Sequence, residues 1–168
     1  MIQNTIDCVL EKSKSVAFTG HRVLKDNFDS KKLKSLLEKL IENGYCNFFV
    51  GMAVGFDTEC FKKLLELRKK YDIKIIACIP CLNQAERFSV FQKKEYEKMV
   101  KLADYKVVLY SEYNDKCMQE RNMFMVDNSS QVISYMYKNL GGTYNTVKYA
   151  LKKGVPVYNV NHIFEEDN

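Results

Sequence analysis

Short apolar runs alternate with longer amphipathic segments along almost the whole chain. A short apolar run is typical of a strand buried on both faces, whereas apolar positions every three or four residues mark one face of a helix. The apolar runs predict strands at residues 15–19, 46–50, 73–79, 105–110, 131–136 and 155–160. The amphipathic segments predict helices at residues 30–43, 58–71, 84–102, 116–127 and 144–153.

This alternation, with short connections between the elements, predicts the fold class. Strands that are joined through helices run parallel, and their right-handed crossovers place helices on both faces of the sheet. We therefore expect an α/β, Rossmann-like three-layer sandwich with a mostly parallel sheet of about six strands. Residues 1–168 contain no internal repeat and no linker-like segment, which favours a single domain with residues 1–14 as a loose N-terminal lead-in.

Charge and hydropathy limit the possible cellular location and binding partners of the protein. The net charge of +5 comes from lysines scattered along helical faces, which is the usual pattern of a solvated surface, although a basic stripe could also contact nucleic acid. No apolar run approaches the roughly 20 residues that a membrane helix needs, and the N-terminus lacks the apolar core of a secretory signal. We expect a cytoplasmic protein without a membrane partner, for which a homo-oligomer is compatible with the sequence.

The six cysteines do not predict a disulfide framework or a metal site. Most of them lie in apolar contexts, where free cysteine behaves as a small hydrophobic residue. The single C-x-x-C pair is Cys78 and Cys81, and with two histidines in the chain it is too little for a structural zinc site. A redox pair would have its first cysteine at the start of a helix, whereas Cys78 is predicted to lie in a strand.

Candidate chemistry gathers where three predicted strands end in glycine and small polar residues. The first strand ends in Thr-Gly-His-Arg at 19–22, the second in Gly-Met-Ala-Val-Gly-Phe-Asp at 51–57, and the fifth leads to Gly-Gly-Thr at 141–143. In an open parallel sheet the ligand lies outside the carboxyl ends of the strands, where glycine lets backbone N–H groups approach a phosphate. Each glycine alone could simply permit a turn. Three such strand ends together indicate an anion site.

The glycine loops match neither common nucleotide fingerprint. The G-x-A-x-G segment at 51–55 lacks the third glycine of a dinucleotide motif, and no G-x-x-x-x-G-K-[ST] sequence occurs. Magnesium-dependent ATP hydrolysis is therefore disfavoured, and we expect no resident cofactor or metal.

The helix at 116–127 carries a second group of candidates. Arg121 could hold a phosphate in bidentate fashion while Asn122 reads a base or ribose edge, but an arginine on an amphipathic helix could equally lie at the surface. Asp127 could contact the ligand or cap a turn. Asp57 could bind ribose hydroxyls, act as a general base, or only complement the helix dipole. For hydrolysis, the candidate catalytic residues are Asp57, Glu59 and His21.

All the predicted ligand-binding residues lie in these segments. They are Thr19, Gly20, His21, Arg22, Gly51, Ala53, Gly55, Asp57, Arg121, Asn122, Asp127, Gly141, Gly142, Thr143 and Thr146.

Taken in order, these motifs, together with Ser-Glu-Tyr at 111–113, resemble the SLOG superfamily (Smf/DprA–LOG). The closest resemblance is to its short, single-domain YpsA/YoqJ-like branch, and it extends from about residue 16 to residue 160. Members of the superfamily have a Rossmann-like sheet and bind nucleotides, nucleotide derivatives or nucleic acid. The resemblance implies that the glycine loops and Arg121 form a phosphate and ribose pocket.

Two groups of SLOG proteins imply different functions. In LOG-type phosphoribohydrolases, a P-G-G-x-G-T-x-x-E motif supplies a glutamate that stabilises a ribosyl cation. Here the proline is absent and Lys148 or Tyr149 occupies the place of that glutamate, and a lysine cannot stabilise a developing cation. The pattern of small residues before Thr146 is more similar to DprA-like proteins, which bind single-stranded DNA across this face and usually carry further domains.

The function that the sequence predicts is binding of a small nucleotide-derived ligand, such as ADP-ribose, an NAD-like molecule or a nucleoside phosphate, for sensing or sequestration. One alternative is a nucleotide N-glycosidase, although the missing glutamate disfavours an enzyme. A second alternative is a binder of single-stranded DNA.

Overall fold

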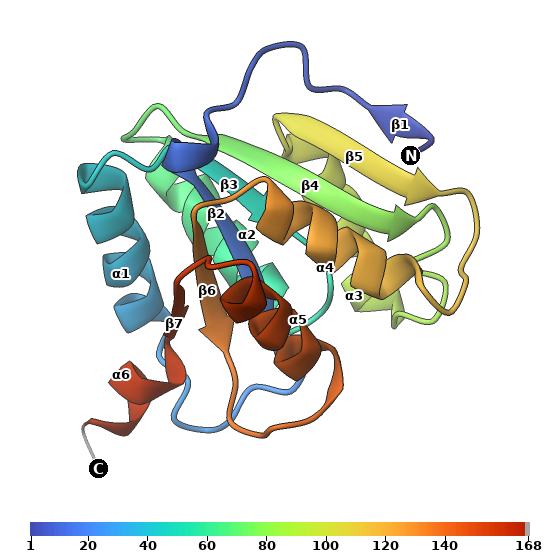
Figure 1. The fold of residues 1–168 in the computed structure, drawn as a ribbon. Helices are drawn as coiled ribbons and strands as arrows, with labels where there is room; N and C mark the ends of the chain where they lie inside the picture. Colours follow the sequence, from blue (N-terminus) through green and yellow to red (C-terminus); the bar gives the residue numbers. More distant parts are fainter. Residues whose placement is uncertain (167–168) are drawn as a thin grey trace.

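Strand β2 (Ser15–Gly20) lies inside the sheet between β3 and β6 and pairs in parallel with both. In the computed structural model, which describes residues 1–166, seven strands form one sheet in the order β1-β5-β4-β3-β2-β6-β7 (Figure 1). The six strands β2 to β7 are parallel, as predicted. Their order reverses beside β2, because the chain moves outward from β2 through β3 and β4 to β5 and then returns to its other side with β6.

The elements fall close to the predicted ranges. The remaining strands are β1 (Gln3–Asn4), β3 (Asn47–Val50), β4 (Lys74–Cys81), β5 (Tyr105–Tyr110), β6 (Gln131–Tyr135) and β7 (Val157–Asn159). The helices are η1 (Lys12–Lys14), α1 (Ser30–Glu42), α2 (Phe56–Arg68), α3 (Val90–Leu102), α4 (Cys117–Asp127), α5 (Gly141–Lys152) and α6 (Asn161–Glu165).

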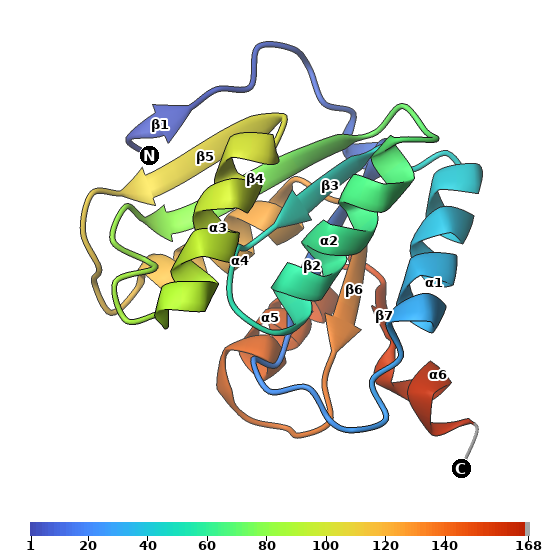
Figure 2. The same ribbon diagram turned by 180° about the vertical axis from the view of Figure 1, so that it is seen from behind.

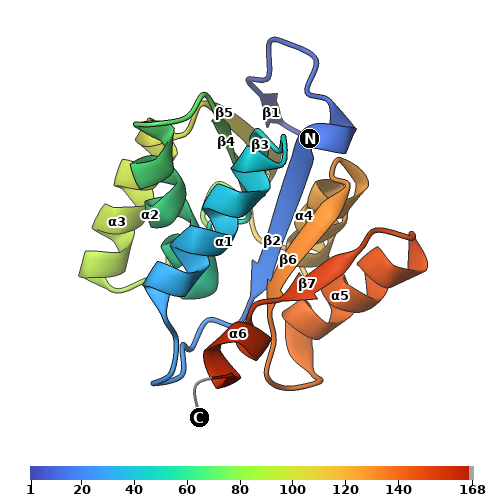
Figure 3. The same cartoon turned by 90° about the vertical axis from the view of Figure 1, so that its left-hand side faces the viewer.

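Helices cover both faces of the sheet, which confirms the three-layer α/β sandwich. Figure 1 shows α4 and α5 on one face, and Figure 2 shows α1, α2 and α3 on the other. Seen toward the edge of the sheet in Figure 3, the two helical layers stand on opposite sides of it. Each layer has its own apolar core: Phe18 and Phe48 pack toward α1 and α2, whereas Ala17 and Phe49 pack toward α4 and α5. This alternation along each strand explains why the strands read as continuous apolar runs.

Part of the N-terminal segment that was predicted as a lead-in joins the sheet. Strand β1 pairs antiparallel with β5, with Gln3 opposite Val108, and the N–H of Ile2 donates to the Val108 carbonyl at 2.9 Å. It therefore covers the edge strand β5, whose unpaired backbone groups would otherwise be exposed. A strand of two exposed residues has no periodicity to detect, which is why the sequence predicted six strands and the sheet has seven.

Two helices begin three or more residues away from their predicted starts. Helix α3 begins at Val90 because the Ser89 hydroxyl accepts from the N–H of Gln92, whose side chain accepts from the Ser89 N–H, and this capping box sets the start of the helix. Residues 82–88 therefore form turns at the end of β4. Helix α5 begins at Gly141, so that the Gly-Gly-Thr segment is its first turn and not a loop before it.

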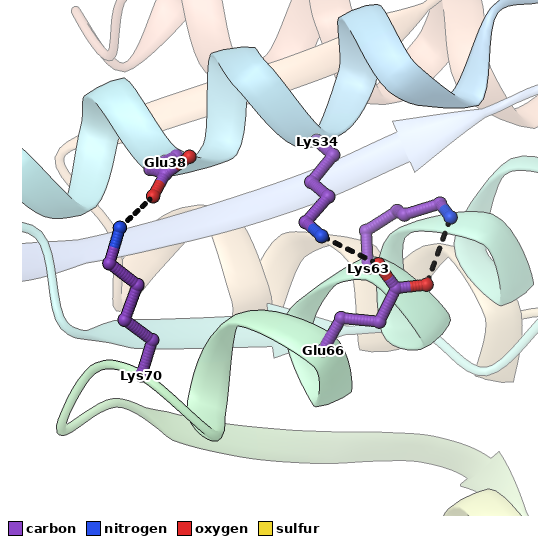
Figure 4. Close-up of polar contacts among 5 residues, drawn as sticks. All are labelled: Lys34, Glu38, Lys63, Glu66 and Lys70. Atoms are coloured by element: carbon purple, nitrogen blue, oxygen red, sulfur yellow. Dashed lines mark hydrogen bonds and ion pairs between the residues drawn. The ribbon is translucent and has the colours of Figure 1, made fainter.

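Lysines of α1, of α2 and of the turn after α2 pair with glutamates at the protein surface. Lys34 and Lys63 both contact Glu66, at 2.9 and 3.0 Å, and Lys70 contacts Glu38 at 3.0 Å (Figure 4). Exposed pairs of this kind contribute little to stability, because solvent screens their attraction. Their importance here lies in charge distribution, because lysines that are paired with carboxylates present little net charge to a nucleic acid.

Candidate functional site at the switch point of the sheet

A cavity of about 400 Å³ opens at the carboxyl ends of β2, β3 and β6, where the strand order reverses. This is the position at which open parallel sheets bind their ligands, because the loops after the two flanking strands diverge and leave a crevice. We call it the β2–β6 cavity. Its wall contains eleven of the predicted ligand-binding residues: Thr19, Gly20, His21, Arg22, Ala53, Asp57, Arg121, Asn122, Gly141, Gly142 and Thr143.

The loop after β2 is held in place by close backbone packing. The N–H of His21 donates to the Tyr135 carbonyl of β6, and the His21 carbonyl accepts from the Phe56 N–H at the start of α2. Gly20 lies against the Phe56 side chain, where an added Cβ would come within 2.3 Å of the ring. Gly55 has a φ of +83°, and an added Cβ there would lie 2.2 Å from the Arg22 carbonyl oxygen. Both glycines are therefore needed for the contact between this loop and α2.

Gly55→Ala is expected to lower the free energy of unfolding by about 1–3 kcal/mol, because the new methyl group meets rigid backbone and the residue has a left-handed conformation. Chemical denaturation measures the change. Gly142→Ala is the matched control: it lies in the first turn of α5 with open space around its added Cβ, so its stability should stay within about 1 kcal/mol of the wild type. Equal stability of the two variants would contradict this account of the loop.

Arg121 is buried, which excludes the surface-arginine alternative. Its side chain comes from the middle of α4 and is 5% exposed. One terminal nitrogen donates to the carbonyls of Gly51 and Cys78, and Nε donates to the Asn122 side-chain oxygen at 2.8 Å. The second terminal nitrogen lies 3.8 Å from the Met118 sulfur, which is a weak acceptor. The guanidinium is thus fixed in orientation while this second nitrogen has donor capacity left for a ligand.

Asp57 faces Arg121 across Gly51, and both side chains are nearly inaccessible to solvent. The carboxylate accepts from the Ala53 N–H at 3.2 Å through Oδ2, and Oδ1 is buried without a hydrogen-bond partner among residues 1–166. Burial raises the pKa of Asp57 to about 6, even though Arg121 lowers it. Burial also lowers the pKa of Arg121. For both groups the cost of desolvation therefore exceeds their mutual attraction, which leaves a polar pair that a bound ligand could stabilise.

His21 forms one side of the cavity together with Tyr137. Its ring centroid lies 4.4 Å from that of Tyr137 in an edge-to-face arrangement, and Tyr137 donates to the Val23 carbonyl. Burial lowers the pKa of His21, and the nearby charges of Lys138 and Lys25 lower it further. The imidazole is therefore neutral at pH 7, and its Nε2, which has no partner within the described chain, can donate or accept one hydrogen bond.

The first turn of α5 completes the cavity. No side chain caps this helix end, so the N–H groups of the first turn lack a side-chain partner at the positive end of the helix dipole, and Gly141, Gly142 and Thr143 of this turn line the cavity. Thr143 is on the wall, whereas Thr146 is buried behind it and donates to the Gly142 carbonyl at 2.8 Å. Arg22 and Lys138, both exposed, add two positive charges at the rim.

Four other predicted residues do not line this cavity. Gly51 lies beneath it and accepts a hydrogen bond from Arg121, and Gly55 supports the Arg22 loop. Glu59 lies one helical turn along α2 and faces a separate small cavity, where it is 3.8 Å from Lys62. Asp127 is at the far end of α4 and accepts from the Tyr149 hydroxyl at 2.7 Å.

Sequence reasoning missed Tyr137, Lys138 and Met118 as wall residues. The first two follow β6 directly, and their position at a strand end could have identified them by the same argument that identified residues 19–22. Met118 lies three residues before Arg121 on α4, and its spacing alone does not distinguish it from a core residue.

The cysteines are all free thiols. Cys78 and Cys81 both lie in β4, and burial raises the pKa of each, so neither is a thiolate at neutral pH. Within residues 1–166, no three His, Cys, Asp or Glu side chains are grouped as a metal site. No helix in the same residues is long and apolar enough to cross a bilayer.

The fold is a Rossmann-like α/β sandwich with a polar, cation-rimmed cavity at the switch point of its sheet. The chain belongs to the YpsA family of SLOG proteins: the family model, described as the YspA SLOG family, matches residues 21–163. A curated relative is the uncharacterised SPbeta prophage-derived protein YoqJ of Bacillus subtilis (strain 168). The two are 33% identical over 136 residues, which cover 72% of this chain and 79% of YoqJ.

Two solved structures have a similar fold. DNA processing protein A from Helicobacter pylori, whose single-stranded DNA binding mode that structure describes, aligns with a TM-score of 0.65 at 20% identity. The same protein from Streptococcus pneumoniae also aligns with a TM-score of 0.65 at 20% identity. The alignments cover 87% and 88% of this chain but only 64% and 50% of those longer chains.

Proposed function

We propose that this protein binds a small nucleotide-derived ligand, such as ADP-ribose, an NAD-like molecule or a nucleoside phosphate, in the β2–β6 cavity, for sensing or sequestration. The observation that carries the proposal is the combination of Arg22, Arg121 and Lys138 with the uncapped first turn of α5 around one cavity. Guanidinium groups and helix N-terminal N–H groups are the donors that phosphate prefers.

The ribose has its own partners in this arrangement. Asp57 lines the cavity, and its Oδ1 has no hydrogen-bond partner among residues 1–166. A carboxylate oxygen accepts hydrogen bonds from ribose hydroxyls. The neutral His21 and the Thr143 hydroxyl lie on the same wall and offer further hydrogen bonds. A ligand that carries both phosphate and hydroxyl groups therefore satisfies more of the buried polar atoms than a free phosphate does.

An N-glycosidase is a second candidate function, because Asp57 has a pKa of about 6, as suits a general acid or base near neutral pH. Of the three candidate catalytic residues, Asp57 and His21 line the β2–β6 cavity, whereas Glu59 does not. Lys148 and Tyr149 occupy the position at which LOG-type proteins have the glutamate, and both have other contacts. The Lys148 ammonium lies over the Tyr144 ring, and the Tyr149 hydroxyl donates to Asp127. These contacts support binding over turnover.

Binding of single-stranded DNA is a third candidate, supported by the fold shared with DNA processing protein A. It requires a positive groove along which bases can stack, and an affinity that falls steeply with salt. Arg22, Arg121 and Lys138 of the β2–β6 cavity are basic groups that such a strand could contact.

A ligand panel separates the three functions. Saturation with a ligand at about 100 times its Kd adds about 2.7 kcal/mol of stability, which corresponds to roughly 5–10 °C in Tm for a chain of this size. We expect such a shift with ADP-ribose, NAD or AMP, with no free base detected by chromatography after incubation. Release of base would favour the N-glycosidase. A shift with oligo(dT) alone, lost between 50 and 200 mM salt, would favour DNA binding and contradict the proposal.

A further inference from the structure

A second cavity, of about 560 Å³, adjoins the β2–β6 cavity over the ends of β3, β4 and β5. The two cavities share Arg22, Ala53 and Met118, which therefore form a common wall between them. The second one is formed mainly by residues 81–92, which span the end of β4, the turns before α3 and the first turn of α3, and by Tyr113 after β5. We call it the Gln84 cavity. None of its residues outside the common wall was predicted from the sequence to bind a ligand.

Gln84 has a buried acceptor without a donor. The side chain is 8% exposed, and its Nε2 donates to the Gly51 carbonyl at 3.2 Å. This bond assigns the other amide atom as Oε1, which has no hydrogen-bond partner among residues 1–166. A buried amide oxygen without a partner is costly, and a ligand N–H group would satisfy it. Among the residues that line this cavity, Gln84 is the one with such an atom in the described chain.

The rest of the wall suits a flat ring. Phe88 is held by an edge-to-face contact with Tyr96 at 5.8 Å between ring centroids. Tyr113 is 60% exposed, and its backbone N–H donates to the Asn83 side chain, which joins the loop after β5 to the turns after β4. Aromatic side chains of this kind stack on nucleobases, and amide groups bond to base edges.

The two cavities differ in charge, and this difference sets which part of a ligand each one suits. The β2–β6 cavity has three cations and the first turn of α5, whereas the Gln84 cavity has one acid, Glu86, one further base, Arg87, and several amides. The Gly51 carbonyl accepts from both Gln84 and Arg121, so that the polar groups of the two cavities are anchored on the same backbone atom. Arg22 lies between them, within reach of a phosphate that enters from either side.

We infer that the Gln84 cavity binds the nucleobase of the ligand, with an N–H group of the base edge donating to Gln84 Oε1 and the ring against Tyr113. The inference rests on the proposed function, since it extends the same ligand from the phosphate site over Arg22 into the neighbouring cavity. It narrows the ligand to one with an N–H on its base edge, such as adenine. A sugar phosphate without a base would occupy only the β2–β6 cavity.

Calorimetric titration with AMP, purine riboside 5′-monophosphate and ribose 5-phosphate tests this inference. Purine riboside lacks the amino group of adenine, and ribose 5-phosphate lacks the base. The wild type should bind AMP about tenfold more tightly than purine riboside monophosphate, and Gln84→Met should bind these two equally. Tyr113→Leu, which changes an exposed side chain and should leave the fold intact, should weaken AMP binding without changing the affinity for ribose 5-phosphate. Tyr158→Leu, an exposed tyrosine of β7, is the matched control and should change neither.

The outcomes separate this inference from the function on which it rests. If AMP binds and Arg22→Ala weakens it, but Gln84→Met and Tyr113→Leu leave the preference for AMP unchanged, the base lies elsewhere and the inference is wrong while the proposed function stands. If neither AMP nor ribose 5-phosphate binds the wild type, both are overturned.

Discussion

Asp57→Asn should make the protein more stable at pH 7 than the wild type. The pKa of Asp57 is about 6 in the folded protein and 3.8 in the unfolded chain, so the folded protein holds this proton more tightly. Each unit of difference corresponds to about 1.4 kcal/mol. Wild-type stability should therefore fall as the pH rises from about 4 to 6, by about 1–3 kcal/mol, and stay at the lower value above pH 6. Asparagine, which has no charge to bury, should avoid this loss.

Urea unfolding at several pH values measures the effect. The two proteins should be equally stable near pH 4. At pH 7, Asp57→Asn should have the higher free energy of unfolding but a lower affinity for the ribose-containing ligand. Asp72→Asn, an exposed aspartate before β4, is the control and should follow the wild type throughout. A variant that is less stable than the wild type at pH 7 would show that Asp57 supports the fold and would remove the argument that its burial serves a ligand.

Arg121→Met should lower the free energy of unfolding by about 2–4 kcal/mol at pH 8, in addition to abolishing ligand binding. The substitution removes buried hydrogen bonds to the Gly51 and Cys78 carbonyls and also the positive charge that faces Asp57. Without that charge the pKa of Asp57 rises further. The destabilisation should therefore be smaller at pH 5, where Asp57 is largely protonated, than at pH 8.

Denaturation at pH 5 and pH 8 tests this dependence, and Arg22→Met is the matched control. Arg22 lines the same cavity but is exposed, so its loss should remove the ligand effect and leave stability within about 0.5 kcal/mol of the wild type. If Arg121→Met is as stable as Arg22→Met, the buried arginine does not hold the Gly51 loop.

The fold could be predicted because its determinants are local and periodic. The apolar runs that became β2 to β7 are buried on both faces, and the helices between them leave few alternatives to a parallel sheet with two helical layers. Strand β1 could not be predicted, because Gln3 and Asn4 have no apolar pattern. They form a strand by pairing with the free edge of β5. The Ser89–Gln92 capping box indicates the start of α3, but the apolar residues before it suggested a helix that begins at residue 84.

Much of the candidate site could also be located, since the carboxyl ends of parallel strands meet at one edge of a sheet. This argument does not place residues along helices. Arg121 and Asp127 are on the same helix, yet they are six positions apart and only Arg121 reaches the cavity. The buried Arg121 side chain donates to the Gly51 carbonyl, which follows β3 and is distant from α4 in the sequence. The Gln84 cavity could not be foreseen, because it is formed by turns that the sequence reads as part of a helix.

The measurement that tests the central claim most directly is calorimetric titration of ADP-ribose into the wild type, Arg22→Ala and Lys12→Ala. Arg22 is exposed at the rim of the β2–β6 cavity, so its removal tests the phosphate site without altering the core, and the exposed Lys12 controls for the loss of one positive charge. We predict a single site in the wild type, unchanged affinity for Lys12→Ala and a loss of at least tenfold for Arg22→Ala. Equal affinity of Arg22→Ala and Lys12→Ala, or no binding by the wild type, would contradict a phosphate site at this cavity.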